Sequence, residues 1–198
     1  MKNLILLFIS VFLNTHVYSQ NIDLINPSKD IGIKKWSIVN DDVMGGISNS
    51  SILINNKKNL LFKGYLSLEN NGGFASSRLD IRQDNLKGVK FFKIKLKGDG
   101  KIYKLRLRQQ NMRASYSCDF KSKKNEWLIV TLPVENFKPT WRGYSYSNYP
   151  ALNLDKINSL SLHISDKQEG RFDLEIEYIV AVKWSKKIKV NPNKILNN

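Results

Sequence analysis

The chain has 198 residues, 41% of them hydrophobic and 11% aromatic, and its 32 Lys and Arg residues against 17 Asp and Glu residues give a formal net charge of +15. This length is typical of one domain, and the apolar content is sufficient for a hydrophobic core, which excludes a globally disordered chain. A strongly basic chain suggests a nucleic-acid-binding protein, an interpretation that the N-terminal segment argues against.

The N-terminus has the pattern of a secretory signal peptide. Lys2 precedes an apolar run from Leu4 to Leu13, and small or moderate-sized residues, Val17 and Ser19, stand three and one positions before Gln20, as at a cleavage site. A run of about ten apolar residues is too short to span a bilayer, although an uncleaved N-terminal anchor is the alternative. We therefore assign residues 1–19 to a signal peptide and expect an exported protein, periplasmic or extracellular. Such a protein has no transmembrane segment after cleavage and no nucleic-acid partner.

The segment after Trp36 combines two adjacent carboxylates with a pair of glycines. Asp41 and Asp42 stand shortly before Gly45 and Gly46. Two consecutive glycines permit positive φ angles and a close approach of another part of the chain. The segment is therefore a candidate functional loop.

A second Gly-Gly pair lies between two predicted strands. Alternating residues predict strands over 60–67 and 74–78, and the second strand places Ser76 and Arg78 on one face. A polar turn joins the two strands and ends in the glycines. The turn consists of Glu69, Asn70, Asn71, Gly72 and Gly73.

Basic residues alternate with apolar residues in two consecutive segments, 92–97 and 103–108. Nine bases and one acid lie between Lys87 and Arg108, and the turn-forming residues 98–101 separate the two segments. Period-two alternation places apolar side chains on one face and basic side chains on the other. The pattern predicts a β-hairpin with a one-sided basic outer face, which is either a solvated surface or a surface for an anionic partner.

Cysteine and histidine are too scarce for several kinds of site. Cys118 is the only cysteine, which excludes an intrachain disulfide, and after removal of the signal peptide His163 is the only histidine. A metal site with the usual Cys and His ligands is therefore excluded. We expect Cys118 to be a buried thiol and His163 to lie at the surface, on the serine face of its strand. No cofactor is predicted.

Many short strands separated by turn clusters favour an all-β, antiparallel β-sandwich or barrel. The domain is expected over residues 20–184, followed by a basic flexible tail over 185–198. Residues 139–154 are rich in aromatic side chains and lack periodicity, so they form either a functional loop or a plug over one end of the sandwich. The predicted strands are Ser51–Ile54, Leu60–Ser67, Phe74–Arg78, Val89–Leu96, Tyr103–Gln109, Ser115–Phe120, Trp127–Leu132, Ser159–Ile164 and Phe172–Val182.

Taken together, the two Gly-Gly motifs resemble a known family. Three segments are similar to the complex I intermediate-associated protein 30 family. They are Asn-Asp-Asp-Val-Met-Gly-Gly-Ile-Ser, Leu-Glu-Asn-Asn-Gly-Gly-Phe-Ala-Ser and Gly98–Arg108. The resemblance extends from about Trp36 to Tyr178. It implies a jelly-roll β-sandwich similar to galactose-binding domains and a non-enzymatic role, since mitochondrial members assist assembly of respiratory complex I.

We expect residues of these motifs, of the basic strands and of the aromatic segment to bind a ligand or partner. Arginines could bind a carboxylate or a pair of sugar hydroxyls, and the loop oxygens could bind hydroxyls or calcium. The alternative is a buried ion pair between Arg78 and Glu69 or Asp42 that locks the two loops together. The candidate binding residues are Asp42, Glu69, Asn71, Arg78, Arg106, Arg108, Trp141, Arg142 and Tyr144. The residues with an expected structural role are Trp36, Met44, Gly45, Gly46, Gly72, Gly73 and Phe74.

We therefore expect an exported, non-catalytic binding module that acts as a protein-binding assembly or chaperone-like factor. The alternative is a carbohydrate-binding module of the cell envelope. The expected partner is a protein of a respiratory complex or of the envelope, or else an acidic or neutral glycan. No residue is assigned a catalytic role.

Overall fold

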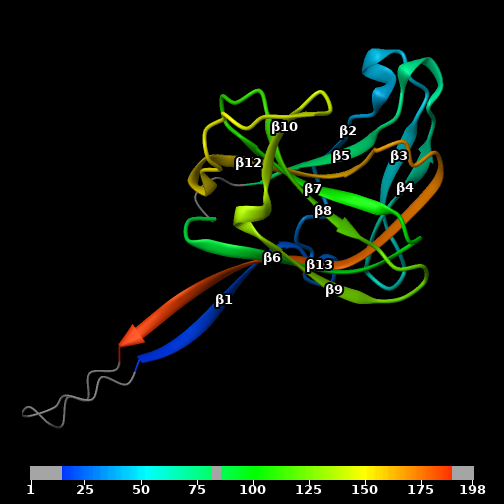
Figure 1. Ribbon diagram of the computed structural model, residues 1–198. Helices are drawn as coiled ribbons and strands as arrows, with labels where there is room; N and C mark the ends of the chain where they lie inside the picture. The colour runs from blue at the N-terminus through cyan, green and yellow to red at the C-terminus, as the bar shows by residue number, and fades with distance from the viewer. Residues whose placement is uncertain (1–14, 82–85, 189–198) are drawn as a thin grey trace, which may run out of the picture.

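Two antiparallel β-sheets pack face to face in a sandwich (Figure 1). The computed structural model describes residues 15–81 and 86–188. This part of the chain contains strands and short 3₁₀ helices, and none of its helices is long and apolar enough to cross a membrane. The antiparallel β-sandwich expected from the strand pattern is confirmed.

The first sheet has six strands in the order β3-β4-β13-β6-β9, with β1 paired to the far part of β13. The long strand β13 is therefore shared by three neighbours. The strands are β1 (Thr15–Ile25), β3 (Asn49–Ile54), β4 (Leu60–Leu66), β6 (Val89–Gly98), β9 (Leu128–Pro133) and β13 (Gly170–Ile188).

The second sheet has seven strands in the order β11-β10-β8-β7-β12-β5-β2. Its centre is formed by β7 and β12, which pair in antiparallel register. The strands are β2 (Trp36–Ile38), β5 (Ala75–Asp80), β7 (Ile102–Gln109), β8 (Ser115–Lys121), β10 (Lys138–Trp141), β11 (Tyr144–Ser145) and β12 (Ile157–Ile164).

The core lies between the sheets and follows the alternation of the strands. In β7, for example, Leu105 and Leu107 are fully buried, whereas Lys104 and Arg106 belong to the outward face. Tyr103 and Phe62 meet edge to face across the two layers, with ring centroids 6.5 Å apart. Cys118 is a buried thiol, as expected.

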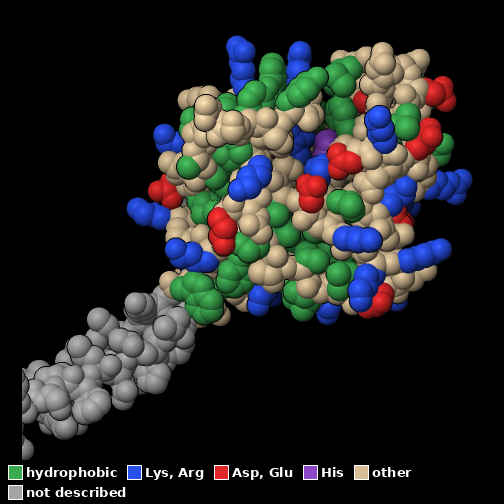
Figure 2. Space-filling model, viewed as in Figure 1, with side chains coloured by type: hydrophobic (Ala, Val, Ile, Leu, Met, Phe, Trp, Pro, Cys, Tyr) green, Lys and Arg blue, Asp and Glu red, His purple; other side chains and the backbone are tan. Residues whose placement is uncertain are grey.

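The predicted basic hairpin is wrong, although both of its strands exist. β6 pairs with β13 and β9 in one sheet, whereas β7 pairs with β8 and β12 in the other. Residues 99–101 therefore carry the chain from one layer to the next, a distance of about 10 Å. The basic faces of β6 and β7 point to opposite sides of the sandwich, and Figure 2 shows Lys and Arg side chains on several sides of the visible face.

The predicted domain boundaries fall within a strand pair. β1 begins at Thr15, and its first residues pair with the end of β13, from Thr15 opposite Ile188 to Gln20 opposite Lys183. In Figure 1 this ribbon extends away from the sandwich. The signal peptide over residues 1–19 and the tail over 185–198 stay predictions, and residues 1–14 and 189–198 lie outside the described residues.

Four strands were missing from the expectation, namely β1, β2, β10 and β11. β2, β10 and β11 are short edge strands of the seven-stranded sheet, and such strands leave little periodicity in a sequence. The aromatic segment thus begins in β10 and includes β11, so it is partly strand rather than an irregular loop throughout.

Candidate functional site

Three arginines lie on the outward face of the seven-stranded sheet. Arg78 of β5 stands opposite Ser161 of β12, which stands opposite Arg106 of β7, so the two arginines share one row across the sheet. Two strand spacings separate their backbones by about 10 Å. Arg108 follows Arg106 on the same face of β7. We call these three residues the arginine row.

The arginine row carries positive charge that no ion pair neutralises in the described part of the chain. None of the three side chains has a carboxylate oxygen within 4.0 Å among residues 15–81 and 86–188. Burial lowers the pKa of Arg106, and the neighbouring cations Arg78 and Arg108 lower it further. Burial and Arg108 likewise lower the pKa of Arg78, which Asp80 only partly offsets. Cations held together in this way repel one another, and a bound anion would relieve that repulsion.

Two buried polar atoms of the same row have no hydrogen-bond partner within the described structure. They are Nε of Arg78 and Oγ of Ser117, whose residue stands opposite Arg106 on β8. Buried polar groups are nearly always satisfied, by protein or by solvent, because an unsatisfied group costs about 1–3 kcal/mol. Within the described structure these two groups are therefore unsatisfied.

His163 lies under this surface rather than at it. The residue is on the outward serine face of β12, as expected, but only 7% of it is exposed, so the expectation of a surface histidine is wrong. The ring of Phe74 stacks on the imidazole with centroids 5.5 Å apart. Nη1 of Arg106 lies 3.4 Å from Nδ1 of His163, and because a guanidinium only donates, the imidazole is the acceptor. Burial, Arg106 and Lys104 hold its pKa well below the ordinary value.

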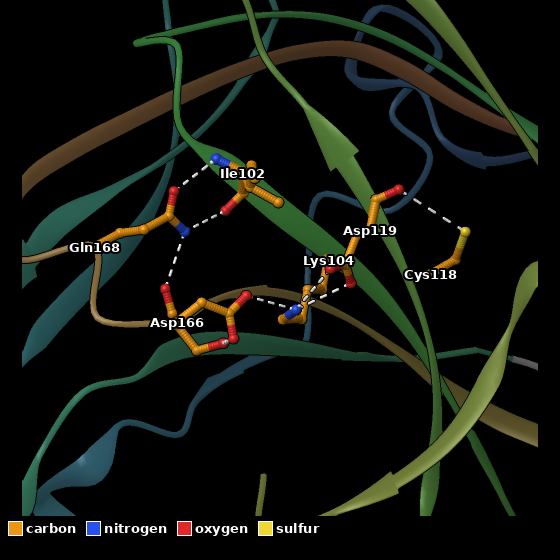
Figure 3. Close-up of polar contacts among 7 residues, drawn as sticks. Ile102, Lys104, Cys118, Asp119, Asp166 and Gln168 are labelled. Atoms are coloured by element: carbon orange, nitrogen blue, oxygen red, sulfur yellow. Dashed lines mark hydrogen bonds and ion pairs between the residues drawn. The ribbon is translucent and has the colours of Figure 1, made fainter. Parts of the chain in front are cut away.

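Lys104 is the neighbour of the arginine row on β7, but its charge is neutralised. Its Nζ lies 2.9 Å from Asp119 Oδ2 and 2.7 Å from Asp166 Oδ2 (Figure 3). The turn that carries Asp166 is held in place by Gln168, which hydrogen-bonds both backbone groups of Ile102. Lys104 and the three arginines thus differ in their surroundings, since Lys104 is held by two carboxylates and the arginines by none within the described structure.

The two Gly-Gly loops are joined through Asp41, which is completely buried. Its carboxylate accepts hydrogen bonds from the backbone N–H and Oγ–H of Ser48, at 2.9 and 2.5 Å, and from the N–H groups of Gly73 and Phe74, at 2.6 and 3.2 Å. Burial raises the pKa of Asp41, but the hydrogen bonds from Ser48, Gly73 and Phe74 outweigh burial and lower it below the ordinary value. We call this arrangement the Asp41 clamp.

The Asp41 clamp explains why each loop has two glycines. A Cβ atom on Gly46 would lie 2.4 Å from Cγ of Asp41, and one on Gly72 would lie 2.6 Å from its Oδ2. The other glycine of each pair has a positive φ, +90° at Gly45 and +131° at Gly73. One glycine in each pair therefore makes room for the carboxylate, and the other turns the chain.

The carboxylates that were expected to bind or to pair lie elsewhere. Asp42, Glu69 and Asn71 are exposed on the loops. No ion pair joins Arg78 to Glu69 or Asp42 in the described structure, so the ion-pair alternative is wrong. The loops are locked by Asp41, which belongs to the first motif but was not among the predicted binding or structural residues.

The outer end of the first loop is apolar. Val43, Met44 and Ile47 are 68%, 59% and 52% exposed, so Met44, for which a structural role was expected, lies outside the core. We call these three residues the apolar tip. Trp36 packs against the core, as expected, and its Nε1 donates to the carbonyl of Gly32 at 2.9 Å.

The aromatic segment divides into an exposed half and a packed half. Trp141 and Tyr144, paired between β10 and β11, are 36% and 72% exposed, and the guanidinium of Arg142 lies 4.9 Å from the Trp141 ring centre. Tyr149 packs against the core and accepts a hydrogen bond from the N–H of Ala114 at 3.2 Å. The second half thus covers the core, and the first half is available at one edge of the seven-stranded sheet.

Within the described chain, no group of three or more His, Cys, Asp or Glu side chains is arranged to hold a metal ion. Burial raises the pKa of the Cys118 thiol to about 11, which makes it a weak nucleophile at neutral pH. The features available for function are therefore the arginine row, the apolar tip and the exposed aromatic edge.

Comparison with known proteins gives a family match. The sequence model of the family described as Complex I intermediate-associated protein 30 matches residues 25–176, which confirms the resemblance of the Gly-Gly motifs. A Schizosaccharomyces pombe protein described as uncharacterized is 29% identical over 168 residues, covering 73% of this chain and 76% of that protein. A Caenorhabditis elegans protein named as a probable mitochondrial complex I intermediate-associated protein 30 is 24% identical over 166 residues, covering 73% of this chain. The match spans about half of that relative, 49% of its length.

Among solved structures, the family 11 carbohydrate-binding module of a cellulosomal cellulase of Clostridium thermocellum is similar in fold. It has a TM-score of 0.61 at 11% identity, over 83% of this chain and 95% of that chain. At this identity the likeness shows the shared sandwich fold alone.

The comparisons contradict the expected localisation. The Caenorhabditis elegans and Caenorhabditis briggsae relatives are both named as mitochondrial proteins. The expectation of an exported, periplasmic or extracellular protein is therefore wrong. The apolar run that suggested it lies outside the described residues.

Proposed function

Because the chain belongs to the complex I intermediate-associated protein 30 family, we propose that it is a non-catalytic binding module that assists the assembly of a respiratory protein complex. The observation that carries the proposal is the extent of the family match, since residues 25–176 include nearly the whole sandwich. In this role the chain holds a subunit or a partly assembled intermediate by contacts on its surface.

The chemistry of the surface supports a binding role. The arginine row, the apolar tip and the exposed aromatic edge present donors and apolar area on open surfaces of the sandwich. His163 is buried under Phe74 with a strongly lowered pKa, whereas an efficient general base has a pKa near the working pH. These are the properties expected of a binding module.

Deletion of the gene in the organism that encodes the chain tests the assembly role. Native gel electrophoresis of its membranes is expected to show less of the fully assembled NADH:ubiquinone oxidoreductase and more of its partial complexes. Re-expression of the chain should restore the assembled complex. A deletion strain with a normal amount of assembled, active complex would exclude this function.

Carbohydrate binding is the second candidate, and the exposed Trp141 and Tyr144 favour it. Aromatic side chains at the edge of a sheet can stack on a sugar ring, while Arg142 beside Trp141 could donate to its hydroxyls. A glycan array that contains acidic and neutral sugars, read with and without calcium, tests it. Binding that disappears in Trp141→Ala and Tyr144→Ala would support it, and an array without binding would remove it.

A further inference from the structure

The arginine row has the features of a site for carboxylates. Its three cations repel one another, and Nε of Arg78 is buried without a partner in the described chain. A guanidinium matches a carboxylate in shape and can bind it with two parallel hydrogen bonds. A bound carboxylate would reduce the repulsion among the three guanidinium groups, which no ion pair in the described chain neutralises.

An open pocket adjoins the arginine row. It has a volume of about 470 Å³, and Arg78, Arg108 and Arg113 line it together with Gln110 and Asn158. A carboxylate in this pocket would meet guanidinium and amide donors. Asp80, which also lines it, is an acceptor for an N–H group of the ligand. The pocket therefore has hydrogen-bond donors next to an acceptor. A polypeptide is complementary to it, because its carboxylates accept and its backbone N–H groups donate.

The apolar tip is connected to the arginine row through a chain of contacts. Asp41 holds the loop of the tip and accepts a hydrogen bond from the N–H of Phe74 at 3.2 Å. Phe74 stacks on His163, which in turn contacts Arg106 at 3.4 Å. These contacts link the loop of the tip to Arg106, and the Asp41 clamp holds that loop in place. A surface that is ordered before binding loses less entropy when a partner binds.

We propose that this surface binds an acidic polypeptide segment, whose carboxylates contact Arg78, Arg106 and Arg108 and whose apolar side chain packs on Val43, Met44 and Ile47. The proposal rests on the assembly function above and names the chemistry of its protein partner. Arg, Met and aromatic residues are enriched in protein–protein interfaces, whereas Lys is depleted. The proposed surface contains three arginines and Met44. Its lysine beside Arg106 on β7, Lys104, is paired with Asp119 and Asp166.

Fluorescence anisotropy with a short labelled peptide tests the proposal on the full chain. The peptide has a central Leu-Phe-Leu flanked on both sides by glutamates. Two further peptides replace the glutamates with glutamines, or the central residues with serines. Binding is expected for the first peptide, with weaker binding of both others.

Arg78→Gln and Arg106→Gln, combined, are expected to weaken binding of the acidic peptide by about tenfold for each arginine, since a hydrogen bond to a charged group contributes about 1.5–3 kcal/mol. Met44→Ser should weaken it by about fivefold, which corresponds to about 1 kcal/mol of apolar burial. The matched control is Lys90→Gln with Lys93→Gln on the other sheet, which removes the same charge and should leave binding unchanged. Circular dichroism verifies that each variant is folded.

Several outcomes would overturn the proposal. Equal weakening by the control pair would mean that only net charge matters. Binding of oligogalacturonate or of phosphatidylglycerol vesicles without binding of the acidic peptide would assign the row to an acidic glycan or a lipid surface. If the arginine variant restores assembly fully in the deletion strain, the surface is wrong but the assembly function stands. If the peptide binds as expected but deletion leaves assembly normal, the surface stands and the function is wrong.

Discussion

Oδ2 of Asp41 lies 2.6 Å from the backbone nitrogen of Gly73, a residue 32 positions further along the chain. This hydrogen bond joins two loops that belong to different parts of the sequence. Ser48 adds two more hydrogen bonds to the same carboxylate. Asp41 is therefore a main support of the loop that carries the apolar tip.

Asp41→Asn is expected to lower the free energy of unfolding by about 3 kcal/mol, because one amide N–H₂ group would then face backbone donors and charged hydrogen bonds would be lost. Asp42→Asn, an exposed neighbour, should change it by less than about 0.5 kcal/mol. Urea unfolding followed by circular dichroism measures both. If both variants unfolded at the same midpoint urea concentration, the hydrogen bonds of Asp41 would not contribute to stability as expected.

Gly72→Ala should destabilise the fold by about 2–3 kcal/mol through overpacking. Its φ of −66° suits any residue, but the new Cβ would lie 2.6 Å from Asp41 Oδ2 and 2.9 Å from the carbonyl oxygen of Glu69. Gly88→Ala is the comparison, since Gly88 has φ +75° and open space around it, so only backbone strain of about 1 kcal/mol applies. Thermal unfolding distinguishes the two, and a larger effect at Gly88 would argue against the steric explanation.

Arg106→Gln is expected to keep the stability of the fold within about 1 kcal/mol or to raise it, because the change removes a buried cation from between Arg78 and Arg108. Lys104→Gln, on the same strand, should lower it by about 1 kcal/mol, since it breaks partly exposed ion pairs to Asp119 and Asp166. Denaturant titration of both variants measures the difference. Strong destabilisation by Arg106→Gln would give this arginine a structural role instead.

The stability of the fold should fall in weak acid because of His163. Burial first, and then Arg106 and Lys104, lower the pKa of the folded imidazole well below 6.5. Below about pH 6.5 the unfolded chain therefore binds a proton that the folded chain does not, and this group removes up to about 1.4 kcal/mol per pH unit. Above that pH both states are neutral and its effect vanishes. In His163→Gln the free energy of unfolding should depend less on pH between pH 6.5 and the pKa of the folded imidazole. If the unchanged chain and the variant show the same pH dependence there, His163 is not the group responsible.

Local pattern alone was sufficient to predict most of the fold. All nine predicted strands exist, and the alternation in β6 and β7 places apolar side chains inward. The side-chain direction along a strand depends on the backbone of that strand alone, so it can be read without knowing the neighbours. The short edge strands β2, β10 and β11 have too few residues to show such a pattern.

Contacts between distant residues decided the rest. β6 and β7 follow one another in the chain but belong to different sheets, because each pairs with strands remote in sequence. Asp41 and Asp42 are adjacent in the sequence, but only the carboxylate of Asp41 accepts hydrogen bonds from Ser48 and Gly73 in the described structure and joins the two loops.

The charges show the same division. The length, composition and motifs of the chain were sufficient to predict a basic β-sandwich with two glycine loops. The folded chain pairs Lys104 with two carboxylates, whereas it places Arg78 and Arg106 in one row with no carboxylate partner in the described chain. A count of charges is a sum over the chain, whereas the availability of a charge depends on the distance to its nearest counter-ion, which folding alone sets.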